Sequence, residues 1–211
     1  MKPYPAIATG TRRQKQKAET QALILDAARE LFEEHGWDGT TTREVAARAG
    51  VGLGTIFSHF PDKGALLIAA LLEDLAQIDA EILDSLPTDA PAKDQIMHFA
   101  AAGFGYWCAR PGLSATLLRE MYFITGVWAD NRRQETDRFI EFVRRLLEGF
   151  RDRGEIRRDI DLRVTAEALY SNYVGSLVRA AGDNRFDADA LLGEFEAYLD
   201  QMLGGIGTNP A

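Results

Sequence analysis

Apolar residues recur at helical spacing along most of the chain. The first clear run falls at i, i+3, i+4, i+7 and i+8, on one helix face: Ile24, Ala27, Ala28, Leu31 and Phe32. Stripes from Phe139 to Phe150 and from Leu191 to Met202 repeat this pattern. Residues 20–66 contain no run that alternates with period two, so no strand is expected there. The pattern predicts an all-α fold of about nine helices.

Turn and capping signals divide residues 18–65 into three helices. Gly36 is placed to end the first helix as a left-handed residue. Thr41-Thr42-Arg43-Glu44 matches a capping box, in which threonine and glutamate side chains bond each other's backbone amides. The turn Gly50-Val51-Gly52 follows, and the third helix, Leu53–Phe60, ends before proline. This arrangement is a helix-turn-helix. Its expected core is Ile24, Ala28, Leu31, Phe32, Val45, Ala46, Val51, Ile56 and Phe60.

Longer helices are predicted beyond this triad. Asp62, Asp161 and Asp187 are each placed to cap the start of one. The predicted segments are Asp62 to about Leu86, Ala92–Ala109, Leu113–Phe123, about Trp128 to Arg153, Leu162–Ala181, and a last helix that includes Leu191 and Met202.

Charge is distributed unevenly. The formal net charge is −8, yet five basic residues precede the first acidic one, Glu19. These residues are Lys2, Arg12, Arg13, Lys15 and Lys17. A basic end on an acidic protein fits a local DNA contact, and a solvated, disordered arm is the alternative.

The sequence lacks the motifs of several kinds of catalytic and metal site. Cys108 is the single cysteine, so no disulfide and no cysteine-rich zinc site is expected. Three histidines occur, and there is no nucleophile elbow, Walker A, HExxH or glycine-rich dinucleotide motif. We therefore expect no enzyme activity, cofactor or metal. No apolar run has the length of about 18 residues that indicates a membrane span, and no secretory signal is apparent, so a cytoplasmic protein is expected.

Residues 24–67 resemble the DNA-binding domain of the TetR family of transcriptional regulators. The matching elements are Ile24-Leu25-Asp26-Ala27-Ala28, Leu31-Phe32, Gly36-Trp37, Thr40-Thr41-Thr42, Arg43-Glu44-Val45-Ala46, Ala49-Gly50-Val51, Gly54-Thr55-Ile56-Phe57, His59-Phe60 and Lys63-Gly64-Ala65-Leu66-Leu67. The resemblance implies a three-helix DNA-binding domain joined by a long helix to a larger helical domain. The expected division is a flexible basic arm (1–17), the DNA-binding domain (18–65), a ligand-binding and dimerisation domain (66–204) and a disordered tail (205–211).

The resemblance also implies a set of DNA-contacting residues: Thr41, Thr42, Arg43, Gly52, Leu53, Gly54, Thr55, Phe57, Ser58, His59 and Lys63. Thr42, His59 and Lys63 would contact phosphates, and Thr55 would read a base edge. Gly52-Leu53 departs from the family's usual polar and basic start of the reading helix, and Phe57 replaces a common tyrosine. Helix capping for Thr42 and solvent exposure for Thr55 are the alternatives.

Two further sets follow from the resemblance. The first is a small-molecule pocket formed by Phe104, Trp107, Cys108, Leu118, Met121, Tyr122, Trp128 and Tyr173. The second is a homodimer interface formed by Tyr170, Val174, Leu177, Leu191, Phe195, Tyr198, Leu199 and Met202. The same residues could instead form an ordinary core.

The combined expectation is a homodimeric, ligand-responsive repressor that releases its operator DNA when a small molecule binds, with no membrane partner. In an activator, the effect of the ligand on transcription would be the opposite. The alternative is a ligand- or protein-binding dimer that has lost specific DNA recognition.

Overall fold

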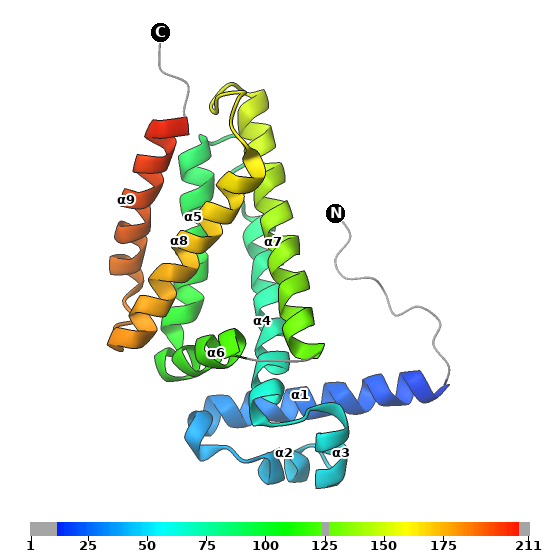
Figure 1. The fold of residues 1–211 in the computed structure, drawn as a ribbon. Coiled ribbons are helices and arrows are strands. Elements are labelled where there is room, and N and C mark those ends of the chain that lie inside the picture. Colours follow the sequence, from blue (N-terminus) through cyan, green and yellow to red (C-terminus); the bar gives the residue numbers. More distant parts are fainter. Residues whose placement is uncertain (1–11, 124–126, 207–211) are drawn as a thin grey trace. The chain divides into compact units, whose positions relative to one another are not determined.

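The protein is helical throughout the described residues. The computed structural model describes residues 12–123 and 127–206 and contains no strand among them. The helices are α1 (Arg12–Gly39), α2 (Thr42–Arg48), α3 (Leu53–His59), α4 (Lys63–Asp84), α5 (Ala92–Ala109), α6 (Pro111–Phe123), α7 (Val127–Asp152), α8 (Leu162–Asp183) and α9 (Ala188–Ile206) (Figure 1). The predicted all-α class is confirmed.

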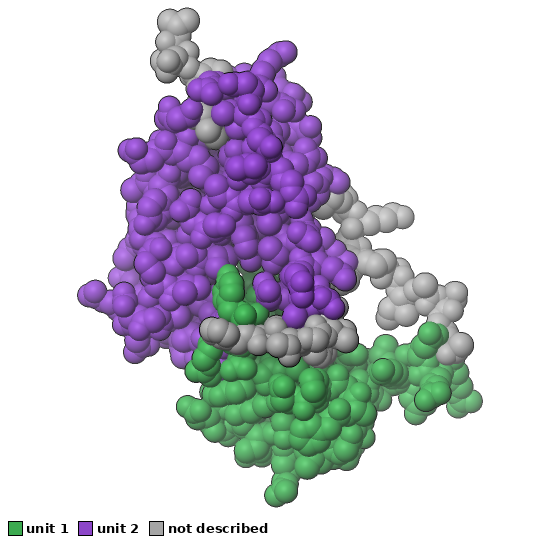
Figure 2. Space-filling model, viewed as in Figure 1, with its two compact units in different colours: residues 1–81, 119–124 green, residues 82–118, 125–211 purple. Residues whose placement is uncertain are grey.

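Two compact units divide the chain, as Figure 2 shows. Unit 1 contains residues 1–81 and 119–124, and unit 2 contains residues 82–118 and 125–211. The division falls inside α4, whereas the sequence placed a domain border at residue 65. The start of α4 therefore belongs to the same packed unit as α1, α2 and α3.

Unit 1 has a dense apolar core built from the faces that the sequence pattern identified. Ile24, Ala28, Val45 and Ile56 are fully buried, and α4 adds an uninterrupted buried run from Ala65 to Leu71. Val51 was predicted to lie in this core but is only half-buried. It lies in the turn between α2 and α3, where packing comes from one side only.

Unit 2 is formed by helices that pack around aromatic side chains. α7 packs against α8, and α5 and α8 both pack against α9. Phe104 of α5 is fully buried, with its ring centroid 4.6 Å from that of Tyr173 and 5.9 Å from that of Phe195. These rings join α5 to the consecutive helices α8 and α9.

Local capping signals act as expected. Asp62 Oδ1 accepts the amide of Ala65 at 2.7 Å at the start of α4. Asp161 Oδ1 accepts two amides in the first turn of α8 at 2.9 and 3.1 Å. Asp187 Oδ1 accepts the amide of Ala190 at 3.0 Å. Each carboxylate satisfies donors that a helix start leaves unpaired.

Both ends of the described chain are more helical than predicted. Residues 12–17, expected in a flexible arm, form the first turns of α1, because Arg, Gln and Lys favour helix once a packed helix follows them. α9 reaches Ile206, two residues into the predicted tail, and the rest of that tail lies outside the described residues.

Gly36 does not end α1 as predicted but kinks it. Its φ of 68° and ψ of −173° interrupt the helix, which resumes and ends at Gly39. The buried Thr40 stabilises the kinked segment, because its hydroxyl lies 2.9 Å from the carbonyl of Leu31 and 2.8 Å from that of Gly36. This role of Thr40 was missed, since it depends on carbonyls that the kink brings together.

Candidate DNA-binding site

The capping box at the start of α2 is present as the sequence predicts. Thr41 has extended backbone angles, and its hydroxyl oxygen accepts the Glu44 amide at 3.2 Å. The Glu44 carboxylate accepts the Thr41 amide and hydroxyl, each at 2.8 Å. These hydrogen bonds from Thr41 lower the pKa of Glu44. The Thr41 hydroxyl is thus engaged within the protein, while the neighbouring Thr42 is half-exposed at the first position of α2.

The turn between α2 and α3 relies on Gly50, which has a φ of 68°. Gly52 then caps α3 with extended backbone and no side-chain hydrogen bond. Ile56 and Phe60 are fully buried and attach α3 to the unit 1 core. The opposite side of this short helix must therefore face away from that core.

The outer face of α3 presents a small residue, an aromatic ring and a hydroxyl. Gly54, Phe57 and Ser58 are all exposed, at i, i+3 and i+4 spacing. No atom lies within 4 Å of where a Cβ on Gly54 would stand. The Phe57 side chain is 49% exposed, although phenylalanine is usually buried. Ser58 donates its hydroxyl to the Thr55 carbonyl at 2.8 Å, and Thr55 and Leu53 are half-exposed.

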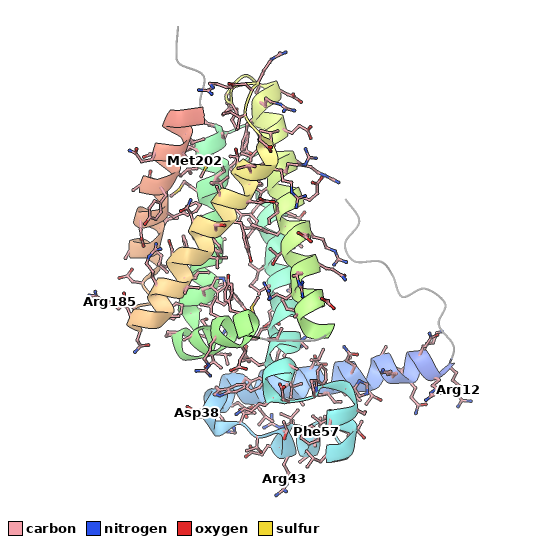
Figure 3. All side chains as sticks on the ribbon, viewed as in Figure 1. Arg12, Asp38, Arg43, Phe57, Arg185 and Met202 are labelled. Carbon is pink, nitrogen blue, oxygen red and sulfur yellow. The ribbon has the colours of Figure 1, made fainter. Side chains whose placement is uncertain are left out.

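The two arginines of α2 differ in whether they form ion pairs within the protein. Arg43 is exposed and projects from α2 on the side away from α1 (Figure 3). Arg48 bonds Glu30 at 2.9 Å and Glu34 at 3.0 Å, which attaches α2 to α1. The pKa of Arg48 is raised and that of Glu34 is lowered by this pairing. Arg43 is the α2 arginine placed for an external anion.

Lys63 is turned toward the protein. Its ammonium donates to the Trp37 carbonyl and lies 4.2 Å from the centroid of the Trp37 ring. That ring stacks on Phe32 at 6.0 Å. Partial burial lowers the pKa of Lys63. The predicted phosphate contact by Lys63 is therefore revised, because its ammonium joins the start of α4 to the kinked end of α1.

His59 ends α3 in a half-buried position. Its Nδ1 is buried and makes no hydrogen bond. Desolvation, and secondly the positive charge of Lys17, lower the pKa of His59. The lowered pKa favours the neutral form of the ring.

The family comparison matches this same region. Residues 24–70 match the model described as bacterial regulatory proteins, tetR family. The matched segment runs from the buried face of α1 through α2 and α3 into α4. This segment is therefore a DNA-binding domain of the TetR family. Its α2–α3 pair is accordingly the helix-turn-helix of a DNA-binding transcriptional regulator.

Similarity to known regulators extends beyond the helix-turn-helix. The HTH-type transcriptional repressor AcnR of Corynebacterium diphtheriae is 28% identical over 76% of this chain and 81% of its own length. The fatty acid metabolism regulator protein of Bacillus subtilis is 23% identical over 91% and 98%. The solved structure of Thermus thermophilus FadR, a repressor in complex with lauroyl-CoA, is 25% identical over 90% and 97%, with a TM-score of 0.74.

Unit 2 contains an apolar cavity of about 40 Å³. It is lined from α5, α7, α8 and α9 by Ile96, Phe99, Ala100, Phe139, Phe142, Val143, Leu146, Leu169, Tyr170, Tyr173 and Phe195. At its edge the Tyr170 hydroxyl lies 3.3 Å from the Thr136 hydroxyl. The cavity holds room for a few waters but is far below the roughly 300–1,000 Å³ of a typical ligand site.

Most residues predicted for the pocket do not line this cavity. Tyr173 does. Phe104, Trp107 and Leu118 are buried but do not line it, although Phe104 packs on Tyr173. Cys108 and Met121 are half-buried, Tyr122 is 43% exposed, and the Trp128 side chain lies outside the described residues. Phe99, Phe139 and Phe142 were missed, because their helices read as plain apolar stripes in the sequence.

Most residues predicted for the dimer interface are occupied within the protomer. Leu177, Leu191, Phe195 and Leu199 are at most 5% exposed. Tyr170 lines the cavity, and Val174 and Met202 are half-buried. Only Tyr198, at 39%, is largely accessible. The alternative left open by the sequence, that these faces cover their own core, applies to the four buried residues.

Among residues 12–123 and 127–206, no helix is long and apolar enough to cross a bilayer.

Proposed function

We propose that this protein is a homodimeric, ligand-responsive repressor of transcription in the cytoplasm. The observation that carries the proposal is the helix-turn-helix itself. α2 is fixed by its capping box, and α3 is anchored by Ile56 and Phe60, so α3 presents Gly54, Phe57 and Ser58 outward. A rigid, convex reading helix of this kind fits the major groove of DNA.

Each exposed residue of the pair has a proposed role on DNA. Gly54 lets the backbone approach a base edge, and Thr55 reads it through its hydroxyl or methyl group. Phe57 packs against sugar and thymine methyl groups. Thr42, at the start of α2, and Arg43 bind phosphate, aided by the positive helix end. These contacts compensate for Gly52-Leu53, which offer no basic side chain.

Dimerisation would place two reading helices about 34–36 Å apart, one turn of DNA. We propose the exposed apolar residues Val164 and Val178 of α8 and Tyr198 of α9 as the interface, at 60%, 46% and 39% exposure. Val164 and Val178 lie two heptads apart and so share one side of α8. Val178→Glu should yield monomers in light scattering, whereas an unchanged dimer mass would contradict this surface.

The apolar cavity is the proposed effector site. Its lining is apolar and rich in aromatic rings, including those of Tyr170 and Tyr173, which suits a mainly apolar ligand. The solved neighbours include Bacillus subtilis FadR with stearoyl-CoA and Thermus thermophilus FadR with lauroyl-CoA. A ligand of that size requires the cavity to open, so it must bind an expanded state more tightly than the DNA-bound state.

Fluorescence anisotropy with a duplex from the promoter beside the protein's own gene tests the DNA role. Binding should weaken steeply with salt. Thr55→Ala should reduce operator discrimination by about 1–3 kcal/mol, and Thr88→Ala, an exposed threonine of unit 2, should not. Failure to prefer any promoter fragment would favour the second candidate function, a dimer that has lost specific DNA recognition. The departures from the family pattern at Gly52, Leu53 and Phe57 support that alternative.

Lauroyl-CoA added to the complex tests the effector role, and a glycine pair supplies the control. A Cβ on Gly103 would stand 2.3 Å from the Tyr173 hydroxyl, whereas a Cβ on Gly105 would meet nothing. Gly103→Ala must displace Tyr173 from Phe104 and so reshape the cavity. It should change the lauroyl-CoA concentration that releases DNA, while Gly105→Ala leaves it unchanged. Equal responses would place the effector elsewhere.

A further inference from the structure

The first turns of α1 carry basic residues on a helix rather than on an arm. Arg12, Arg13, Lys15 and Lys17 are all exposed, and no acidic residue precedes Glu19. Figures 1 and 3 show this end of α1, with Arg12 at its tip, extending past α3 in unit 1. A helix rises about 1.5 Å per residue, so Arg12 stands about 7.5 Å along the axis beyond Lys17.

Two of the basic residues, Arg13 and Lys17, continue the face that packs on the core. Lys17, Ile24 and Leu31 are spaced by seven residues, so they lie on nearly the same side of α1. Ile24 and Leu31 are 0% and 3% exposed. The buried face of α1 thus becomes a basic face once the helix passes the edge of the core.

The charge of Lys17 reaches the end of the reading helix. It contributes to lowering the pKa of His59, the last residue of α3. The basic face therefore borders the α3 surface to which DNA binding is assigned above.

Helix stability does not account for these cations. The first turn of a helix carries a partial positive charge, so basic side chains there are unfavourable and acidic ones favourable. α1 has no acidic residue in its first turn. A basic cluster kept at the unfavourable end fits binding of an external polyanion.

We propose that Arg13 and Lys17 form a rigid extension of the DNA-binding surface that binds phosphates flanking the base pairs read by α3. The proposal rests on the proposed function, since it requires α3 to lie on DNA. Its contribution is affinity and salt dependence and not base discrimination, because phosphates carry no sequence information directly.

The test compares two variants with equal net charge. The first is Arg13→Gln/Lys17→Gln. The control replaces two arginines of unit 2 by Gln: Arg133 and Arg145, whose side chains are 68% and 62% exposed. Gln retains helix propensity, and circular dichroism checks that both variants keep their helix content and melting temperature.

Binding to the promoter duplex is measured by anisotropy from 50 to 200 mM salt. Two lost phosphate contacts should lower the slope of log K against log salt by about 1.8, which is a difference of about 12-fold across this range. The control should keep the wild-type slope. Trimming the base pairs outside the recognised half-sites should lower the wild-type slope and leave that of the α1 variant unchanged.

A fall of less than one unit in the α1 variant, or an equal fall in the control, overturns the proposal while wild-type binding upholds the proposed function. Absence of any operator preference in the wild-type protein would instead overturn the proposed function, and this inference with it.

Discussion

Replacing Lys63 by methionine separates two roles that the same residue could have. The family resemblance implies that Lys63 binds a phosphate, whereas in the structure its ammonium donates to the Trp37 carbonyl and lies over the Trp37 ring. Methionine keeps most of the apolar side chain and removes the charge and the donors. The variant therefore removes either an internal link or a DNA contact.

The magnitude follows from the two contacts that are lost. A hydrogen bond from a charged donor contributes about 1.5–3 kcal/mol, and a partly exposed cation–π contact about 0.5–1 kcal/mol. The Trp37 carbonyl keeps a long hydrogen bond from the Thr40 amide at 3.4 Å, and methionine recovers some packing. We expect a net loss of about 2 kcal/mol, or roughly 4–8 °C in melting temperature for a chain of this size.

Thermal unfolding by circular dichroism and the salt dependence of promoter binding are measured together. Lys63→Met should melt earlier and keep the wild-type salt slope. Arg43→Gln, on the exposed side of α2, should melt at the wild-type temperature and have a salt slope lower by about 0.9. The reasoning is refuted if Lys63→Met melts like the wild type and loses about one unit of slope, because the ammonium would then face phosphate.

Three further outcomes are expected for residues of unit 1, one of them with a control in unit 2. The pKa of His59 is lowered in the folded state. As the pH falls below about 6.5, the unfolded chain therefore binds a proton at His59 more readily than the folded chain does. Stability should fall as pH drops through this value, less so in His59→Gln, and Lys17→Gln should raise the His59 pKa in an NMR titration. Gly36→Ala should lower the free energy of unfolding by about 1–3 kcal/mol, because φ of 68° with ψ of −173° suits glycine alone. The control Gly149→Ala, in open space on α7, should instead stabilise the protein by about 0.5–1 kcal/mol. Equal melting temperatures for the two variants would argue against the kink. Thr41→Val should lower the melting temperature by removing the hydroxyl of the capping box, and an unaltered melt would mean that the box contributes nothing.

The helix-turn-helix could be predicted from the sequence because its signals are local. The capping box spans four residues, and the positive φ of Gly50 needs a glycine whatever surrounds it. The buried faces of α1 and α2 follow from spacing along each helix. Residues that are close in the chain determine these features, so no knowledge of the fold is needed to find them.

Only the tertiary structure decided which apolar residues line the cavity, fill the core or reach the surface. Phe195 and Leu199 lie on the same apolar stripe in the sequence, yet Phe195 lines the cavity of unit 2 and Leu199 does not. Phe139, on another helix, also lines the cavity, whereas Val178 is exposed. Periodicity identifies an apolar face but not the helix that covers it. In the same way, the partner of Lys63 is a carbonyl 26 residues away in the chain. The sequence by itself determined the reading helix and its anchors, and packing between distant segments determined everything that depends on which surfaces remain open.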